Sequence, residues 1–191
     1  MTDFILFLRR YVSQPSQVGS VIPSSRFLCK RMMEAVPWDE ARVIVELGPG
    51  TGVFTKDILK KKRSNSTFFV IERDGKFQEI LRGRFPGLLI KDEAQYLGQY
   101  LREQGLSKVD AVVSSLPFAN FPEELRSEIL QTIVDTLSPD GVFVTYQYSL
   151  QLKPELELLF EQVKVGFTPF NIPPAFIYTC RKSVSSHEGD T

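Results

Sequence analysis

The sequence is poor in histidine and cysteine, with one His and two Cys among 191 residues. His187 lies near the C-terminus, and Cys29 and Cys180 are far apart in the sequence. This set is too small for the usual zinc sites, so we expect no metal. It also argues against catalysis by a Ser-His-Asp or Cys-His arrangement. Two distant cysteines make no disulfide framework, which favours a reducing cytoplasm.

The sequence also lacks an excess of charge of one sign and a long apolar run. It has 23 Lys and Arg against 23 Asp and Glu, giving a formal net charge of zero. Nucleic-acid-binding domains are usually basic, so this balance disfavours a nucleic acid partner. No apolar run approaches the ~18 residues of a transmembrane helix, and the N-terminus has no basic region or cleavage site of a signal peptide. A soluble globular protein is expected.

Apolar runs alternate with amphipathic stretches through the middle of the chain. Strands are predicted over residues 43–47, 67–71, 88–90, 109–114 and 142–148, with a closing hairpin over 166–170 and 176–181. Helices are predicted over residues 53–62, 76–85, 94–104, 122–137 and 152–163, with a turn at 138–141. This alternation predicts βαβ units. We therefore expect an α/β fold of three layers, doubly wound around a mostly parallel seven-stranded sheet with a C-terminal antiparallel hairpin.

We expect three parts along the chain. Residues 1–36 form an N-terminal helical segment, residues 37–182 form the main domain, and residues 183–191 form a disordered tail without apolar periodicity. Residues 4–12 are apolar except for Arg9 and Arg10. Such a helix either lies at the surface of an anionic membrane or packs on the domain or on a second copy, and the sequence leaves both alternatives open.

A glycine-rich loop follows the first predicted strand and precedes a helix. It reads Gly48-Pro49-Gly50-Thr51-Gly52. The Gly-x-Gly-x-Gly spacing differs from the Gly-x-Gly-x-x-Gly of dinucleotide-binding enzymes. Glycines let the backbone turn sharply and approach a ligand closely, and the proline removes one N–H donor from a pyrophosphate cradle. The pattern favours a loop that binds a ligand over an empty turn.

Acidic residues follow the next two predicted strands. Glu72 ends the second strand, 20 residues after Gly52, where a carboxylate accepts hydrogen bonds from a ribose diol. Asp92, Glu93 and Ala94 follow the third strand. A carboxylate there could read the amino group of an adenine, and Asp92 and Glu93 are alternatives for that role. Capping of the next helix is the competing interpretation for either of them.

These motifs resemble those of class I S-adenosylmethionine (SAM)-dependent methyltransferases. Residues 45–55 (V-E-L-G-P-G-T-G-V-F-T) look like motif I, Glu72 matches the acidic position of motif II, and residues 114–118 lie where motif IV follows the fourth strand. The resemblance covers about residues 17–182 and implies a Rossmann-like fold, with SAM as cofactor and S-adenosylhomocysteine as product. The cofactor-binding residues that it implies are Gly19, Ser20, Glu46, Gly48, Pro49, Gly50, Thr51, Gly52, Glu72, Arg73, Glu93, Ala94 and Ser115.

Within this class, residues 17–26 and 115–122 look most like small soluble bacterial phospholipid N-methyltransferases. That resemblance implies N-methylation of an amine head group, with phosphatidylethanolamine as the leading candidate, and contact with the inner face of the membrane. It implies that the catalytic residues are Ser115, Leu116, Pro117, Phe118 and Tyr146. The implied substrate-binding residues are Ser25, Arg26, Phe118 and Tyr148. Phe118 would face the amine by a cation–π contact, Arg26 would meet a lipid phosphate, and packing is the alternative role for the tyrosines.

The rRNA adenine N6-dimethyltransferases are a more distant resemblance. Their Asn-Leu-Pro-aromatic motif has its counterpart at residues 115–118, where Ser115 replaces the asparagine. A serine hydroxyl cannot place an amide carbonyl at the target amine. The zero net charge and the lack of room for an extra RNA-binding domain also disfavour RNA. An rRNA or small-molecule acceptor, a nicotinamide oxidoreductase and a non-catalytic binding module are the remaining alternatives, and no feature indicates an oligomeric state.

Overall fold

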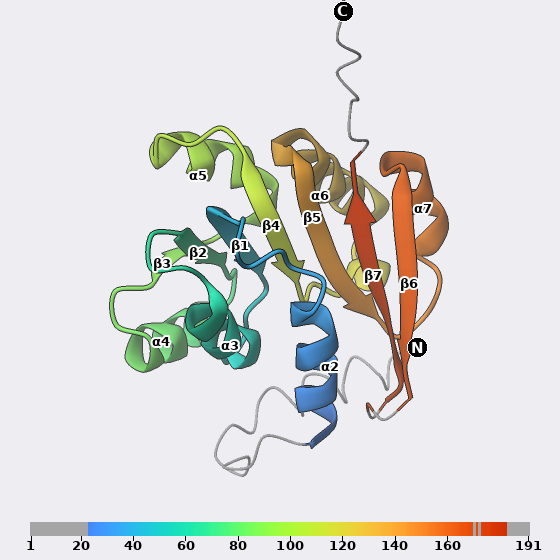
Figure 1. Ribbon diagram of the computed structural model, residues 1–191, viewed down its shortest axis with the longest axis horizontal. Coiled ribbons are helices and arrows are strands. Elements are labelled where there is room, and N and C mark those ends of the chain that lie inside the picture. The colour runs from blue at the N-terminus through green and yellow to red at the C-terminus, as the bar shows by residue number, and fades with distance from the viewer. Residues whose placement is uncertain (1–22, 170, 172, 183–191) are drawn as a thin grey trace, which may run out of the picture.

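The computed structural model of the chain shows one mixed sheet between two layers of helices (Figure 1). It describes residues 23–169, 171 and 173–182, with side chains from residue 27 onward. The seven described strands have the order β3-β2-β1-β4-β5-β7-β6, and β7 runs antiparallel to the other six. The strands are β1 (Val43–Leu47), β2 (Thr67–Ile71), β3 (Leu89–Lys91), β4 (Val109–Ser114), β5 (Leu137–Gln147), β6 (Gln162–Thr168) and β7 (Ala175–Arg181). This topology confirms the predicted doubly wound sheet and its C-terminal hairpin.

The helices divide between the two faces of the sheet. They are α2 (Pro23–Met33), α3 (Val53–Lys61), α4 (Gly75–Arg84), α5 (Leu97–Glu103), α6 (Glu123–Thr136) and α7 (Lys153–Leu159). Short 3₁₀ turns, η2 (Ala94–Tyr96) and η3 (Phe118–Asn120), follow β3 and β4. In Figure 1, α2, α3 and α4 lie in front of the sheet, and α6 and α7 lie behind it. The predicted three layers are therefore confirmed.

The central strands are apolar because both of their faces are buried. Along β1, Val45 and Leu47 join the core beneath α5, α6 and α7, whereas Ile44 joins the core beneath α2 and α3. Continuous apolar runs of this kind are typical of parallel strands that are covered on both sides. Helix α2 belongs to the second core, since its Met32 is fully buried there. The described part of the N-terminal segment thus packs on the domain.

Strand β5 starts earlier than the sequence predicts. Residues 138–141 have the composition of a turn, but the structure includes them in β5. Leu137 is buried and pairs with Val109 of β4, and the register shifts before Ala111. The hydroxyl of Ser138 donates to Asp110 Oδ1 at 3.0 Å. Pairing with β4 therefore overrides the local preference for a turn.

The predicted helix over residues 152–163 is too long. Helix α7 ends at Leu159, and β6 already begins at Gln162. Val163 pairs with Cys180 of β7 in the antiparallel hairpin. The alternating residues at the start of β6 fit a strand at the edge of the sheet better than another helical turn. Across the described ranges, no helix is long and apolar enough to cross a lipid bilayer.

Candidate functional site

The strand order reverses direction between β1 and β4, and ligands in such sheets bind beyond the carboxyl ends of the strands at this point. Backbone hydrogen bonds join three loops there. Gly48 N–H donates to the carbonyl of Ile71, and Ser115 N–H donates to the carbonyl of Leu47, both at 2.9 Å. The residues after β1, β2 and β4 therefore form one edge of the molecule.

The three glycines of the loop after β1 have different reasons for lacking a side chain. Their φ angles are +69° at Gly48, +56° at Gly50 and +83° at Gly52, all in the left-handed region. A Cβ on Gly48 would lie 2.8 Å from the side chain of Leu116, and one on Gly52 would lie 2.4 Å from the ring of Phe85. A Cβ on Gly50 would meet nothing within 4 Å. The open side of the loop is thus at Gly50, where a ligand can approach the backbone.

The carboxylate of Glu72 is held at the end of β2 by the glycine loop. Its Oε2 accepts from Gly50 N–H and its Oε1 from Asp74 N–H, both at 2.9 Å. Burial raises the pKa of Glu72, and these two backbone hydrogen bonds oppose the increase. Each carboxylate oxygen has a second lone pair, so Glu72 can still accept from the hydroxyls of a ribose. The predicted pair of glycine loop and acidic residue is brought together.

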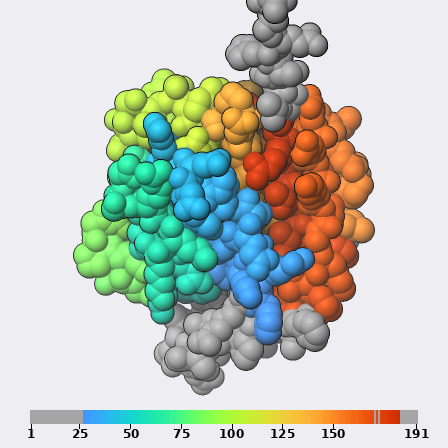
Figure 2. Space-filling view, viewed as in Figure 1, coloured from blue at the N-terminus to red at the C-terminus, as the bar shows by residue number. Residues whose placement is uncertain are grey.

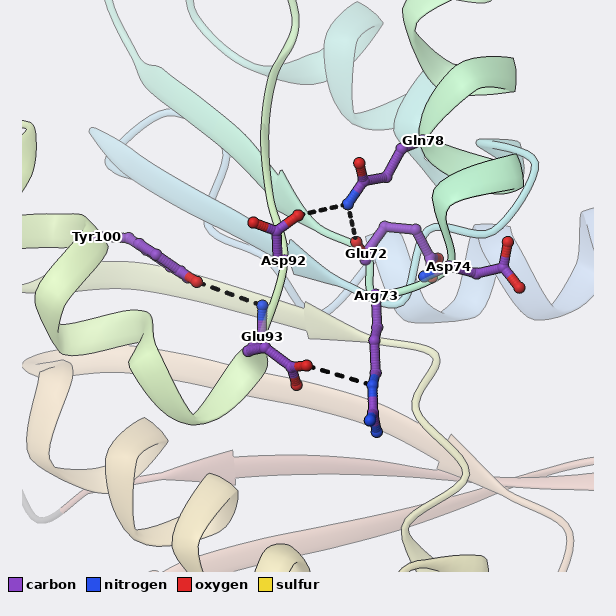
Figure 3. A network of polar contacts seen from close by, with 7 residues as sticks. All are labelled: Glu72, Arg73, Asp74, Gln78, Asp92, Glu93 and Tyr100. Atoms are coloured by element: carbon purple, nitrogen blue, oxygen red, sulfur yellow. Dashed lines mark hydrogen bonds and ion pairs between the residues drawn. The ribbon is translucent and has the colours of Figure 1, made fainter.

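A polar network links the ends of β2 and β3 (Figure 3). The amide of Gln78 donates to the carbonyl of Glu72 at 2.7 Å and to Asp92 Oδ1 at 2.6 Å. Glu93 instead forms an ion pair with Arg73, with 3.2 Å between Oε1 and Nε. Gln78 was missed from the sequence because a glutamine on a helix gives no signal of its partners.

Glu93 precedes the 3₁₀ turn η2, but its side chain makes no capping hydrogen bond. The helix-capping interpretation of Glu93 is therefore wrong. Its carboxylate extends to Arg73, next to Glu72 in sequence, and Figure 3 shows the two side chains approaching each other from the loops after β2 and β3. Ala94 begins η2 and is partly buried. The cofactor-binding roles of Arg73, Glu93 and Ala94, including adenine recognition by Asp92 or Glu93, stay predictions.

Glu46 is fully buried in β1, two residues before the loop. Its Oε2 accepts from the hydroxyl of Thr55 at 2.6 Å, and among the described residues its Oε1 has no hydrogen-bond partner. Burial, as the largest effect, raises the pKa of Glu46 to about 8. A buried oxygen without a partner fits a ligand that brings a hydrogen-bond donor, as the amino acid part of SAM does. Thr55 was missed because its partner lies nine residues earlier on another element.

The segment after β4 is fixed by main-chain contacts. Leu116 N–H donates to Ser114 Oγ at 3.1 Å, and the Leu116 carbonyl accepts from the Gln147 amide at 2.9 Å. Leu116 also packs against Gly48 of the glycine loop. Ser115 and Pro117 are both partly exposed in this segment. These contacts hold the predicted catalytic segment against the predicted cofactor loop.

The ring of Phe118 lies in the core. It is fully buried and makes edge-on contacts with Phe121 and Phe143, with ring centroids 6.0 and 6.1 Å apart. A ring with no exposed face cannot contact an amine here, so we correct its assignment from substrate binding and catalysis to packing. The apolar character of the residue did not reveal which way it points.

The two tyrosines of β5 and its end pack with each other. Tyr146 contacts Phe54 of α3 edge-on at 6.1 Å and Tyr148 edge-on at 5.7 Å between ring centroids. Both rings are only partly buried, so a packing role and an amine contact are compatible. Gly19 and Ser20 lie outside the described residues, as do the side chains of Ser25 and Arg26 and the predicted helix over residues 4–12.

Comparison with known proteins adds a relative of nearly the same length. The chain is 35% identical over 187 residues to the ornithine lipid N-methyltransferase of Singulisphaera acidiphila, covering 95% of this chain and 97% of that protein. It is 30% identical over 111 residues to the ribosomal RNA small subunit methyltransferase A of Borreliella burgdorferi, which covers 56% of this chain and 35% of that protein. No protein-family model matches the chain.

Solved structures show the same fold at low sequence identity. The N-methyltransferase NodS of Bradyrhizobium japonicum, in complex with S-adenosylhomocysteine, has a TM-score of 0.68 and 12% identity, covering 93% of this chain and 97% of that chain. A precorrin-6y C5,15-methyltransferase of Geobacter metallireducens has a TM-score of 0.65 and 15% identity, covering 82% of this chain and 88% of that chain. These likenesses show that the chain shares the fold of these methyltransferases. Given the glycine loop, the fold and the near full-length relative, the chain belongs to the class I SAM-dependent methyltransferases, in the family of the ornithine lipid N-methyltransferase.

Proposed function

We propose that this methyltransferase transfers a methyl group from SAM to the amine of a lipid head group. The observation that supports it most is the 35% identity, over nearly the full length of both chains, to a protein named for N-methylation of ornithine lipid. Phosphatidylethanolamine, the candidate favoured by the sequence, shares with ornithine lipid an amine in a polar head group. The proposal therefore names aminolipids as the substrate class, with these two as the members to test.

The described residues fit the tasks of holding the cofactor and keeping the site dry. SAM, when bound, supplies a methyl group on a sulfonium leaving group. Gly50 leaves open space for the ligand, Glu72 presents acceptors for a ribose, and Glu46 offers a buried acceptor. The amine must be positioned in line with the methyl group as a neutral lone pair. The described residues contain no histidine to act as its base.

An apolar site supports loss of the amine proton without a dedicated base. Burial disfavours the charged form of an ammonium group and so lowers its pKa. Leu116 and Pro117 border the carboxyl end of β4, and Tyr146 and Tyr148 border that of β5. A lipid amine that enters between these segments leaves bulk water and loses its proton more readily. The tyrosine hydroxyls are the polar groups we propose for orienting it.

The test is transfer of a labelled methyl group from SAM. The chain is incubated with phosphatidylethanolamine, with ornithine lipid, with a total lipid extract and, in parallel, with naked rRNA. We expect label in the amine of one or both purified lipids. The competing acceptor is rRNA, because a relative named as an rRNA methyltransferase also aligns to this chain, although over only 56% of it. Label on rRNA adenine at a higher rate than on any lipid would contradict the proposal.

A further inference from the structure

The two helical layers have opposite charge, although the whole chain has a net charge of zero. Helices α2, α3 and α4 contain nine basic and two acidic residues, a net charge of +7. Helices α5, α6 and α7 contain three basic and seven acidic residues, a net charge of −4. The two layers lie on opposite faces of the sheet (Figure 1). One broad side of the molecule is therefore basic and the other acidic.

Apolar side chains lie among the cations of the basic side. On α2 the exposed residues include Phe27, Lys30 and Arg31, and on α3 they include Lys56, Leu59 and Lys60. We call these six residues the α2–α3 face. The Phe27 side chain is 53% exposed and Leu59 is 36% exposed. Figure 2 looks onto this side, with α2 and α3 next to each other on the surface.

Among the described residues, few acidic groups oppose the cations of this face. Glu34 forms an exposed ion pair with Arg31, with 3.6 Å between the charged atoms. The carboxylate of Asp57 accepts from the thiol of Cys29 at 3.1 Å, which holds it against α2. Lys30, Lys56 and Lys60 remain as exposed cations around Leu59 and Phe27. Cations around apolar side chains are typical of surfaces that rest on anionic bilayers.

We propose that the α2–α3 face docks on the surface of a bilayer that contains anionic lipids. This inference rests on the proposed function, since an aminolipid keeps its acyl chains in the bilayer while its amine is methylated. The cations would meet lipid phosphates, and Phe27 and Leu59 would enter the boundary between head groups and acyl chains. The opposite, acidic layer would be repelled by the same surface, which fixes the orientation of the molecule.

The location of the site agrees with this orientation. Helix α3 begins at Val53, directly after the glycine loop. The carboxyl edge of the sheet, where the cofactor and the acceptor meet, therefore adjoins the N-terminal end of α3. An aminolipid in the docked bilayer would reach the site from the border of the α2–α3 face, without leaving the membrane surface. RNA would also attract the cations, but Leu59 would gain nothing from a phosphate backbone.

The test is flotation of the full chain, bound to SAM, with vesicles of phosphatidylglycerol and phosphatidylcholine, which lack a methylatable primary amine. Each basic residue near such a surface changes partitioning by about fivefold. We therefore expect the double variant Lys56→Glu/Lys60→Glu to bind at least about 25-fold more weakly. The matched control Arg102→Glu/Lys108→Glu reverses two exposed cations outside this face, and should stay within about twofold of the wild type. Residues 1–22 are present in every variant, so their contribution cancels.

Further arms separate the possible outcomes. Leu59→Gln should weaken vesicle binding severalfold even at high salt, where screening removes most of the electrostatic attraction. SAM affinity, measured by calorimetry, should be unchanged in all of these variants. Equal binding of the α2–α3 variant and its control would overturn docking by this face. If the wild type binds vesicles weakly but binds an RNA oligonucleotide, and the double variant loses that RNA binding, the face is an RNA-binding surface and docking on a bilayer is overturned.

Activity on lipid in neutral detergent micelles distinguishes this inference from the proposed function. Micelles present the amine without an anionic surface, so the double variant should methylate micellar lipid at the wild-type rate and vesicle lipid slowly. Methylation of micellar lipid without charge-dependent docking would support the proposed function and refute docking by the α2–α3 face. Charge-dependent docking without methylation of any lipid would support docking by the α2–α3 face and refute the proposed function.

Discussion

Replacement of Glu46 by glutamine should make the protein more stable and bind SAM less tightly. Glu46 is fully buried, and its Oε1 has no partner among the described residues. Glutamine keeps a carbonyl oxygen that can accept from Thr55 and removes the ionisable group. We therefore expect Glu46→Gln to remove the cost of keeping this buried acid protonated at neutral pH. We also expect it to weaken SAM binding, because the second carboxyl oxygen, an acceptor two residues before the glycine loop, is lost.

The magnitude follows from the pKa. Burial raises the pKa of Glu46 from its ordinary value of 4.5 to about 8, so the folded state holds a proton that the unfolded state has lost. Between these two values, the free energy of unfolding falls by about 1.4 kcal/mol for each pH unit. The loss reaches about 3 kcal/mol at pH ~7. This contribution is fully present below pH ~4.5 and is lost as the pH rises to about 8.

The measurement is urea unfolding of the wild type and of Glu46→Gln across a pH series from about 5 to about 8.5. We expect the two free energies to be similar at the acidic end and to diverge as the pH rises, with the variant more stable by a few kcal/mol at pH 8.5. At pH 8.5 the full gain is about 5 kcal/mol, which for a chain of this size corresponds to roughly 10–20 °C in melting temperature. Glu79→Gln, an exposed acid on α4, is the control and should leave the profile unchanged. Parallel profiles for the wild type and Glu46→Gln would refute a raised pKa at this residue.

Three further predictions concern the glycine loop and the core. Gly50→Ala and Gly105→Ala place a side chain at similar φ angles, +56° and +69°, with nothing within 4 Å, so each should lower stability by about 1 kcal/mol. Only Gly50→Ala should weaken SAM binding in calorimetry, by at least about tenfold, and equal SAM affinities would contradict a ligand at this loop. Gly52→Ala should destabilise by about 2–4 kcal/mol in thermal unfolding, because its Cβ would lie 2.4 Å from the ring of Phe85, and a melting temperature like that of Gly105→Ala would argue against this contact. Phe118→Leu should lower stability by about 1 kcal/mol and leave KM for lipid unchanged, whereas a raised KM at unchanged stability would restore Phe118 as a substrate contact.

The central sheet could be predicted from the sequence because its strands are buried on both faces. Strands β1 and β4 have the predicted bounds, and their continuous apolar character leaves little choice of structure. Predictions failed toward the edge of the sheet. Residues 138–141 and 160–163 have local preferences for a turn and a helix, but pairing with strands distant in sequence decides their structure. Such pairing contributes no periodicity to a single segment.

The site could be predicted only where a motif has a fixed position on the fold. Gly50 and Glu72 were both identified from their places after successive strands, and the structure joins them by a hydrogen bond. The contacts of Thr55 and Gln78 depend on how helices α3 and α4 approach the sheet. The direction of the Phe118 ring depends on the 3₁₀ turn after β4. These features come from packing, for which the sequence offers no local signal.

The zero net charge of the whole chain is a weak argument against nucleic acid, because a partner contacts only one side of the molecule. Electrostatic attraction in solution acts over a Debye length of about 8 Å at physiological salt, which is less than the thickness of three packed layers. A partner that contacts the basic layer therefore responds to the net charge of +7 on helices α2, α3 and α4, and not to the acidic residues on the far side. What distinguishes an anionic bilayer from RNA is the chemistry between the cations and at the acceptor site. Leu59 lies among lysines, and Ser115 replaces the asparagine of the rRNA enzymes, so both features favour a lipid on grounds that the total charge does not provide.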